Sequence, residues 1–219
     1  MKETHLLQTQ AYDYLIDLIK KGELQPDTIY SLNKLAKESG VSRTPFRDAV
    51  LCLDQERDLD VLASKGFVLH KMTKEDIVET YQIRSAIEVY CFKQLSRHLE
   101  TERGQQYYAK LSSKVDSQKE IARTTCSTED FGRKDYEFHR SLVQYVGNAS
   151  MLEIYRRFMY RIFWLNVTSF SRDGRMDETI TEHDAFLRML REHDMTGLED
   201  MVEHHLATAQ NINLTLLES

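Results

Sequence analysis

The chain has very few residues that break or turn a backbone. Its 219 residues include only 8 glycines and 2 prolines. All-β sandwiches and barrels need many tight turns, and such turns are rich in glycine and proline. Long helices need far fewer of them. The scarcity of turn-forming residues therefore predicts a mainly α-helical fold.

The composition is that of an ordinary globular protein. Apolar residues make up 41% of the chain and charged residues 29%, a balance that argues against disorder. No stretch approaches the roughly 18 apolar residues that a membrane-spanning helix needs, and the N-terminus is too polar for a secretory signal. The 3 cysteines are odd in number and far apart, unlike a disulfide framework. We expect a cytoplasmic protein with reduced thiols and no membrane partner.

The net charge of −6 does not decide whether nucleic acid is a partner. Even the first 72 residues are nearly neutral, with 10 Lys and Arg against 11 Asp and Glu. Affinity for DNA comes from neutralising phosphates with Lys and Arg, so DNA binding would depend on a local cluster of these residues.

The first third of the chain predicts a characteristic order of short elements. A helix is expected over residues 6–20, a second over 32–39, and a third within 41–58. Gly40 ends the second helix in a tight turn. Residues 59–70 carry β-branched residues around a Ser-Lys-Gly turn and predict a small hairpin. This order is that of a winged helix-turn-helix.

Four polar residues stand where such a fold reads DNA. The second helix of a helix-turn-helix enters the major groove, and its first residues reach the base edges. Here those residues are Ser42, Arg43, Thr44 and Arg47. The two arginines lie one turn apart on one face, and arginine pairs bidentately with guanine O6 and N7. The alternative is that both arginines are solvated charges on an ordinary helical hairpin.

The run LAKESGVSRTPFRDAVLCL resembles the DNA-binding signature of GntR-family transcription regulators. The rest of the chain resembles the FadR-like branch of that family, in which a C-terminal helical FCD domain binds an effector. The resemblance implies a homodimer that binds double-stranded DNA at a short inverted repeat, most commonly as a repressor. It also makes Asn33 and Lys65 expected DNA contacts.

The sequence departs from the family pattern in three places. Asn33 stands where many relatives have an arginine, and Arg57 and Asp58 replace the usual Gly-Leu turn before the wing. The flank of the wing is also unusually acidic, with Asp54, Glu56, Asp58 and Asp60. These departures bear on the operator sequence and on the affinity for DNA.

A second domain is expected to begin at Thr73, giving domains 1–72 and 73–219. Thr73 and Asp76 form a capping-box pattern at the start of a long helix. Further helices are predicted over residues 102–123, 129–146, 149–171, 177–192 and 195–217. The fold class is therefore a winged helix-turn-helix followed by an antiparallel bundle of about six helices, with room for a ligand between them.

Four residues of the bundle predict a metal site. Asp135 and His139 are spaced i,i+4 and so project from one helical face, and His183 and His205 lie on two later helices. One carboxylate and three imidazoles suit a divalent transition metal such as Zn, Ni or Mn. Without further information, four such residues could equally be scattered surface groups. The metal-binding subgroup of FadR-like regulators carries the same residues in the same order, which implies that these four are ligands. The neighbouring His204 points about 100° away around the helix.

Arg84 is the expected contact for a small organic-acid effector, because the resemblance puts an inward-facing arginine at this position. A guanidinium group can hold a carboxylate through two hydrogen bonds, and Tyr81, one turn earlier, is a second candidate. The alternative is an i,i+4 ion pair between Arg84 and Glu88 on the surface.

Two other functions compete with a metal-containing regulator. His183-Asp184 and His193-Asp194 resemble the dyads of helical metal-dependent phosphohydrolases, in which a metal activates water. That hypothesis leaves the winged-helix segment without a role, so we expect no enzyme. In the other alternative, the regulator holds no metal and Arg84 alone sets the ligand preference.

Overall fold

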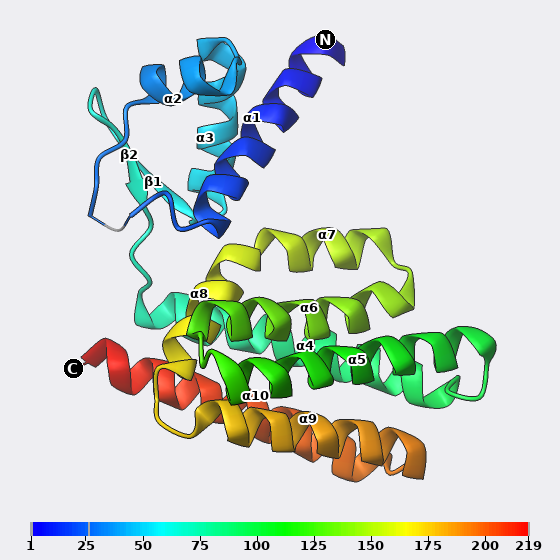
Figure 1. Ribbon diagram of the computed structural model, residues 1–219. Coiled ribbons are helices and arrows are strands. Elements are labelled where there is room, and N and C mark those ends of the chain that lie inside the picture. The colour runs from blue at the N-terminus through cyan, green and yellow to red at the C-terminus, as the bar shows by residue number, and fades with distance from the viewer. Residues whose placement is uncertain (1, 26, 219) are drawn as a thin grey trace. The chain divides into compact units, whose positions relative to one another are not determined.

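A computed structural model describes residues 2–25 and 27–218 (Figure 1). The chain divides into two compact units, the first ending at Met72 and the second beginning at Thr73. Across the described residues the fold is mainly helical, with one two-stranded antiparallel sheet. No helix among those residues has the length and apolar content that a bilayer crossing requires.

The first unit has the predicted order of elements. Three helices precede a hairpin, and their bounds are α1 (Lys2–Lys20), α2 (Leu32–Ser39), α3 (Arg43–Gln55), β1 (Leu59–Leu62) and β2 (Gly66–Leu69). The strands pair antiparallel, with Leu59 opposite Leu69 and Leu62 opposite Gly66. The winged helix-turn-helix expected from the sequence is therefore confirmed.

Local sequence signals explain where α2 and α3 lie. The Ser31 side chain accepts a hydrogen bond from the Lys34 amide and caps the start of α2. Gly40 follows the helix with φ of 71°, in the left-handed region that glycine adopts without steric cost. The predicted apolar face of α3 is buried: Phe46, Ala49, Val50 and Leu53.

The acidic flank of the wing takes part in building it. Asp54 accepts a hydrogen bond from the Val61 amide at 2.8 Å, and Asp60 lies 2.8 Å from the Nδ1 atom of His70. Asp58 is buried, with 1% of its surface exposed. These carboxylates are thus oriented by the protein at the base of the hairpin, and they do not form a free acidic face.

The second unit is a bundle of helices. Their bounds are α4 (Lys74–Arg97), α5 (Glu102–Thr124), α6 (Thr128–Val146), α7 (Ala149–Arg157), α8 (Met159–Phe170), α9 (Arg175–Glu192) and α10 (Met195–Glu218). The capping box of Thr73 and Asp76 is present at the start of α4. The segment predicted as one helix over 149–171 is two helices, which meet at Phe158 with φ of −90° and ψ of 5°.

The bundle interior combines an apolar core with a polar centre. Helix α4 packs against α6 and α10, and α5 packs against α6 and α9. Phe92, Leu142, Phe186 and Leu206 are among the buried apolar side chains. Charged and polar side chains from α4, α5, α6, α8, α9 and α10 are also buried. Because buried polar groups are costly unless they are paired, this polar centre is the natural candidate for function.

Candidate metal centre and nucleic-acid interface

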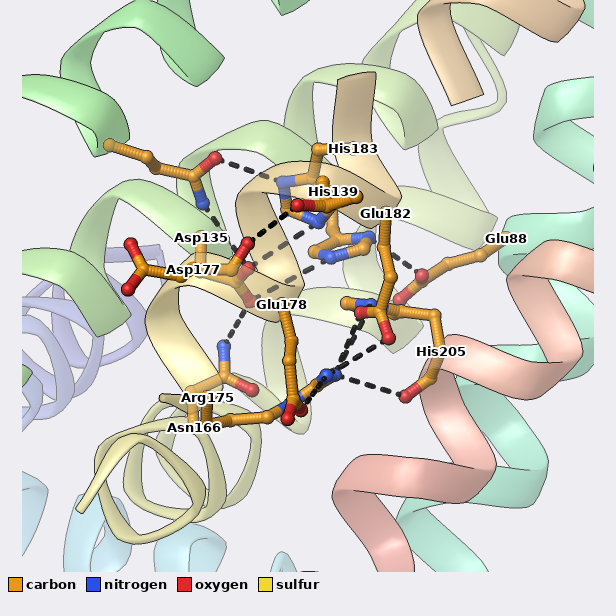
Figure 2. A network of polar contacts seen from close by, with 12 residues as sticks. Glu88, Asp135, His139, Asn166, Arg175, Asp177, Glu178, Glu182, His183 and His205 are labelled. Atoms are coloured by element: carbon orange, nitrogen blue, oxygen red, sulfur yellow. Dashed lines mark hydrogen bonds and ion pairs between the residues drawn. The ribbon is translucent and has the colours of Figure 1, made fainter. Parts of the chain in front are cut away.

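The four predicted metal ligands meet in the interior of the bundle. Asp135 and His139 come from α6, His183 from α9 and His205 from α10, and Figure 2 shows them turned toward one another. Each offers one ligand atom, and these atoms all lie within 4.8 Å of one another. All four side chains are buried, whereas His204 is exposed. Helix packing thus gathers donors that are up to 70 residues apart in the chain.

The aspartate lies between two of the histidine rings. His139 Nε2 is 3.7 Å from Asp135 Oδ2, and His183 Nε2 is 3.6 Å from Asp135 Oδ1. Neither Nε2 atom has a hydrogen-bond partner among the described residues, although both are buried. Two buried nitrogen atoms without partners, next to a carboxylate, fit a cation that would bind all three groups.

Each of the three rings has an oxygen atom beside its other nitrogen. Gln118 Oε1 is the hydrogen-bond partner of His183 Nδ1 at 2.9 Å, and Glu182 Oε2 is that of His205 Nδ1 at 2.6 Å. Because these oxygens only accept, the Nδ1 atoms of His183 and His205 carry the proton. Their Nε2 lone pairs are then left free for a metal, an arrangement common to metal-binding histidines. Glu88 Oε2 lies 2.7 Å from His139 Nδ1, within ion-pair distance.

Two amide side chains hold Asp135. Asn166 Nδ2 donates to Asp135 Oδ2 at 2.7 Å, and Gln118 Nε2 donates to Asp135 Oδ1 at 3.3 Å. An NH₂ group only donates, so both oxygens of Asp135 act as acceptors, as in the ionised carboxylate.

The electrostatics favour neutral imidazoles at His183 and His205 and an ionised carboxylate at Glu182. Burial lowers the pKa of His183 well below 6.5, and nearby cationic groups lower it further. Burial also lowers the pKa of His205, against the opposing effect of Glu182. Burial alone would raise the pKa of Glu182, but hydrogen bonds from His205 and Arg175 lower it to about 2. These are the protonation states that a metal requires of its ligands.

Arg84 is buried, as the inward-facing hypothesis predicts, and it is also paired with Glu88. Its Nε atom donates to Glu88 Oε1 at 2.8 Å and its Nη1 atom to Asn166 Oδ1 at 3.2 Å. The side chains of this pair are only 2% and 0% exposed. The alternative was therefore right about the ion pair between Arg84 and Glu88 but wrong in placing it on the surface. The Nη2 atom of Arg84 is buried and has no hydrogen-bond partner in the part of the chain that the structure describes.

Tyr81 is buried beside Arg84, with the guanidinium carbon 5.6 Å from the centre of its ring. Its hydroxyl group accepts a hydrogen bond from Asn213 at 3.1 Å. Burial raises the pKa of Tyr81 to about 12, so the ring is neutral in the physiological range.

Several residues that contact the cluster were not among the predicted site residues. Arg175 is 1% exposed and binds both oxygens of Glu182, at 2.9 Å each. Glu182 could have been found because it directly precedes His183, and Asn166 because it is polar on an otherwise apolar helix. The sequence carries no comparable signal for Gln118.

The first unit brings the predicted DNA contacts to one groove. A groove of about 320 Å³ is lined by Asn33 from α2, Arg43 and Arg47 from α3 and Lys65 from the hairpin turn, among other residues. All four side chains are exposed. The remaining two predicted contacts, Ser42 and Thr44, are also exposed at the start of α3 but are not part of the groove lining.

The two His-Asp dyads do not come together. Asp184 forms an exposed ion pair with Lys119 at 2.9 Å, although its neighbour His183 faces the cluster. The side chain of His193 is 54% exposed, and Asp194 accepts a hydrogen bond from the Gly197 amide. The phosphohydrolase hypothesis thus lacks its second dyad.

Comparison with known protein families gives two matches that together cover most of the chain. Residues 7–69 match the model described as bacterial regulatory proteins, gntR family, and residues 79–208 match the FCD domain.

Individual relatives agree with these matches. The chain is 26% identical over 200 residues to YdhC, an HTH-type transcriptional regulator of Bacillus subtilis, covering 90% of this chain and 85% of the relative. It is 29% identical over 141 residues to the gluconate operon transcriptional repressor of Bacillus licheniformis, covering 63% of this chain and 54% of that protein. A solved GntR regulator from Rhodococcus sp. RHA1 shares the fold, with a TM-score of 0.74, 19% identity and coverage of 95% of this chain and 97% of the other.

Proposed function

The chain belongs to the GntR family of bacterial regulatory proteins and carries an FCD domain, so it is a transcriptional regulator and not an enzyme. From this premise we propose that it is a cytoplasmic repressor. A small organic acid either releases it from its DNA operator or recruits it there. Residues 1–72 bind DNA, and residues 73–219 bind the acid and form a homodimer. Two-fold symmetry of the dimer matches an operator built as a short inverted repeat. The repressor role is supported by the gluconate operon relative, which is named as a repressor.

The groove between α2, α3 and the hairpin turn is the observation that carries the proposal for DNA. It gathers the cationic side chains of Arg43, Arg47 and Lys65 around one hollow of an otherwise nearly neutral unit. Arg43 and Arg47 read guanine edges in the major groove, while Lys65 contacts phosphate from the wing. Asn33 contributes a neutral donor and acceptor from α2.

The polar centre of the bundle supports an acid ligand. Arg84 keeps one buried donor, Nη2, without a protein partner, and a carboxylate is the group that a guanidinium binds best. Tyr81 borders this position.

A divalent transition metal, such as Zn, Ni or Mn, is proposed as the cofactor of the same site. Asp135, His139, His183 and His205 would hold it, and their mix of nitrogen and oxygen donors suits these metals better than Mg or Ca. When bound, the metal would supply a Lewis-acid centre that attracts the carboxylate oxygens of the acid. The protein's own residues orient the ligands, neutralise their charge and position the acid against Arg84.

Regulation follows if the acid prefers one orientation of the DNA-binding units over another. A ligand shifts such an equilibrium only by its difference in affinity for the two states.

The test is a fluorescence-anisotropy titration with DNA from upstream of the protein's own gene, with scrambled duplex as competitor. Selective binding should be salt-sensitive and should be lost in Arg43→Ala and Arg47→Ala. The control Lys21→Ala removes an exposed cation outside the groove and should bind almost normally. Equal loss in all three variants would contradict a specific reading role for the arginines.

Elemental analysis of untagged protein, before and after incubation with Zn or Ni, separates a metal-containing regulator from one that relies on Arg84 alone.

A further inference from the structure

The buried polar centre carries more negative than positive charge. Its ionised groups are the carboxylates of Glu88, Asp135 and Glu182 and the guanidinium groups of Arg84 and Arg175. The charge of Arg84 and the contact with His139 hold the pKa of Glu88 below its ordinary value in spite of burial. With the imidazoles in the neutral form that binds a metal, one negative charge remains uncompensated. Such a centre repels a second anion.

A divalent cation at the four ligands reverses the sign of this charge. The same groups then carry one excess positive charge, which a single carboxylate from a ligand would neutralise. Uncompensated charge in a protein interior is strongly unfavourable, so the loaded centre favours one monoanion. Glu178 also contacts Arg175, but its side chain is 47% exposed and its charge is screened by water.

Glu88 connects the candidate ligand arginine to a candidate metal ligand. One of its oxygens, Oε1, accepts from Arg84 Nε at 2.8 Å and from the Tyr155 hydroxyl at 2.9 Å. The other oxygen, Oε2, lies 2.7 Å from His139 Nδ1. A cation on Nε2 of that ring makes the ring more positive and strengthens its attraction for Glu88 Oε2. The carboxylate is then drawn toward His139, and its hold on Arg84 weakens.

Asn166 makes the second connection. Its carbonyl oxygen accepts from Arg84 Nη1 at 3.2 Å, and its NH₂ group donates to Asp135 at 2.7 Å. The orientation of the amide is fixed from both sides, because a guanidinium only donates and a carboxylate only accepts. Arg84 is thus connected to His139 through Glu88 and to Asp135 through Asn166. Its Nη2 atom remains available to a ligand.

We propose that Glu88 is an internal counter-anion that makes binding of a monocarboxylate conditional on the cation. Without the cation, Glu88 neutralises Arg84 and the centre is already negative, so the open Nη2 donor of Arg84 does not attract an anion. With the cation, the charge excess becomes positive and the same donor holds the incoming acid. This inference rests on the proposed metal and acid site. It adds that the acid binds well only after the metal has bound.

Linkage gives a direct test with small probes. If the cation promotes anion binding, the anion must raise the affinity for the cation by the same factor. The affinity for Zn²⁺ is measured by competition with a chromogenic chelator, in acetate or lactate and in chloride of equal ionic strength. For the wild-type protein we expect either acid to tighten Zn²⁺ binding, within the range of about 5- to 150-fold that is typical of such coupling.

Two substitutions change the charge of the centre in opposite directions. Glu88→Gln keeps the shape of the side chain and removes its charge, so acetate should bind even the metal-free variant, as detected by saturation-transfer NMR. Its coupling to Zn²⁺ should fall, and Zn²⁺ itself should bind about 10- to 100-fold more weakly because His139 loses its carboxylate. Asn166→Asp adds a negative charge, so the loaded centre loses its positive excess and acetate should tighten Zn²⁺ binding less than in the wild-type protein.

Glu79→Gln is the matched control, since Glu79 is an exposed glutamate on the same helix; circular dichroism verifies the fold of each variant. If neither acid changes the affinity of the wild-type protein for Zn²⁺, acid binding does not depend on the cation and this inference is wrong, whereas the proposed metal site is not contradicted. The same conclusion would follow if both charge variants behaved like Glu79→Gln. Failure to bind one Zn²⁺ per chain would instead overturn the metal site together with this inference, while DNA binding is measured separately by anisotropy.

Discussion

The two candidate sites of this protein place their cations in opposite environments. Arg43 and Arg47 of the winged helix are exposed and lie beside an open groove. Arg84 and Arg175 of the bundle are 2% and 1% exposed, and each is paired with a carboxylate, Glu88 and Glu182 respectively. An exposed cation remains available to a large polyanion and is screened by salt. A buried cation is oriented in advance by its partners and discriminates by charge and shape.

The difference teaches which experiments report on which unit. Substitutions at the exposed arginines should change binding but hardly affect folding, since surface charges contribute little to stability. Substitutions in the bundle should affect folding and ligand binding together, because removing one partner leaves another charge buried and unpaired.

The largest expected effect is on the stability of the bundle. Arg175→Met keeps most of the side-chain volume but leaves Glu182 without its bidentate partner, so the free energy of unfolding should fall by about 3–5 kcal/mol. Urea unfolding followed by circular dichroism measures this loss. The control Arg172→Met removes a half-exposed arginine on the connection just before α9 and should cost about 0–1 kcal/mol. Equal losses would show that the buried pair has no special importance.

The second prediction concerns acid. His183 and His205 are neutral in the folded bundle at pH values where the unfolded chain binds protons, because burial lowers both pKa values. The metal-free protein should therefore be most stable above pH 6.5 and lose stability as the pH falls below it. Each neutral histidine contributes a slope of up to about 1.4 kcal/mol per pH unit.

Thermal unfolding of metal-free protein between pH 8 and pH 5 provides the measurement. His183→Gln should flatten the profile, and His204→Gln, which changes an exposed histidine, should leave it unchanged. A profile that is flat in the wild-type protein would contradict buried neutral imidazoles.

The third prediction separates reading from attraction in the winged helix. Arg43→Ala should weaken binding to the preferred duplex by about 1–3 kcal/mol and relax the preference at one base pair. Lys65→Ala should weaken binding to preferred and scrambled duplexes alike and reduce the salt slope by about one. Anisotropy titrations at several salt concentrations distinguish the two. Identical behaviour of the two variants would remove the distinction between base and phosphate contacts.

The sequence predicted most of the fold because its signals are local. Gly40 and the capping box at Thr73 mark helix ends within a few residues of chain. The break at Phe158 was missed because the apolar pattern continues across it without glycine or proline. Hydrophobic periodicity does not register a single residue that leaves the helix.

The candidate site was predictable only in part. The pair Asp135 and His139 follows from i,i+4 spacing, and the other ligands follow from a family resemblance. Gln118 and Arg175 could not be predicted, because each acts through side chains that packing brings from other helices. Glu88 was considered only as a surface partner of Arg84, since spacing shows which residues share a face but not what that face contacts.

The smallest expected effect concerns the turn between α3 and the wing. Arg57 has φ of 56°, in the left-handed region that glycine adopts without steric cost. A side chain in this conformation costs roughly 1–2 kcal/mol relative to glycine, although glycine also makes the unfolded chain more flexible. Arg57→Gly should therefore stabilise the first unit by less than about 1 kcal/mol. The converse change is Gly40→Ala. Gly40 has φ of 71°, and no atom would contact the added methyl group, so backbone strain alone should destabilise the first unit by about 1 kcal/mol. Urea midpoints of both variants test the pair; if Arg57→Gly destabilises as much as Gly40→Ala, contacts of the arginine outweigh the strain of its backbone.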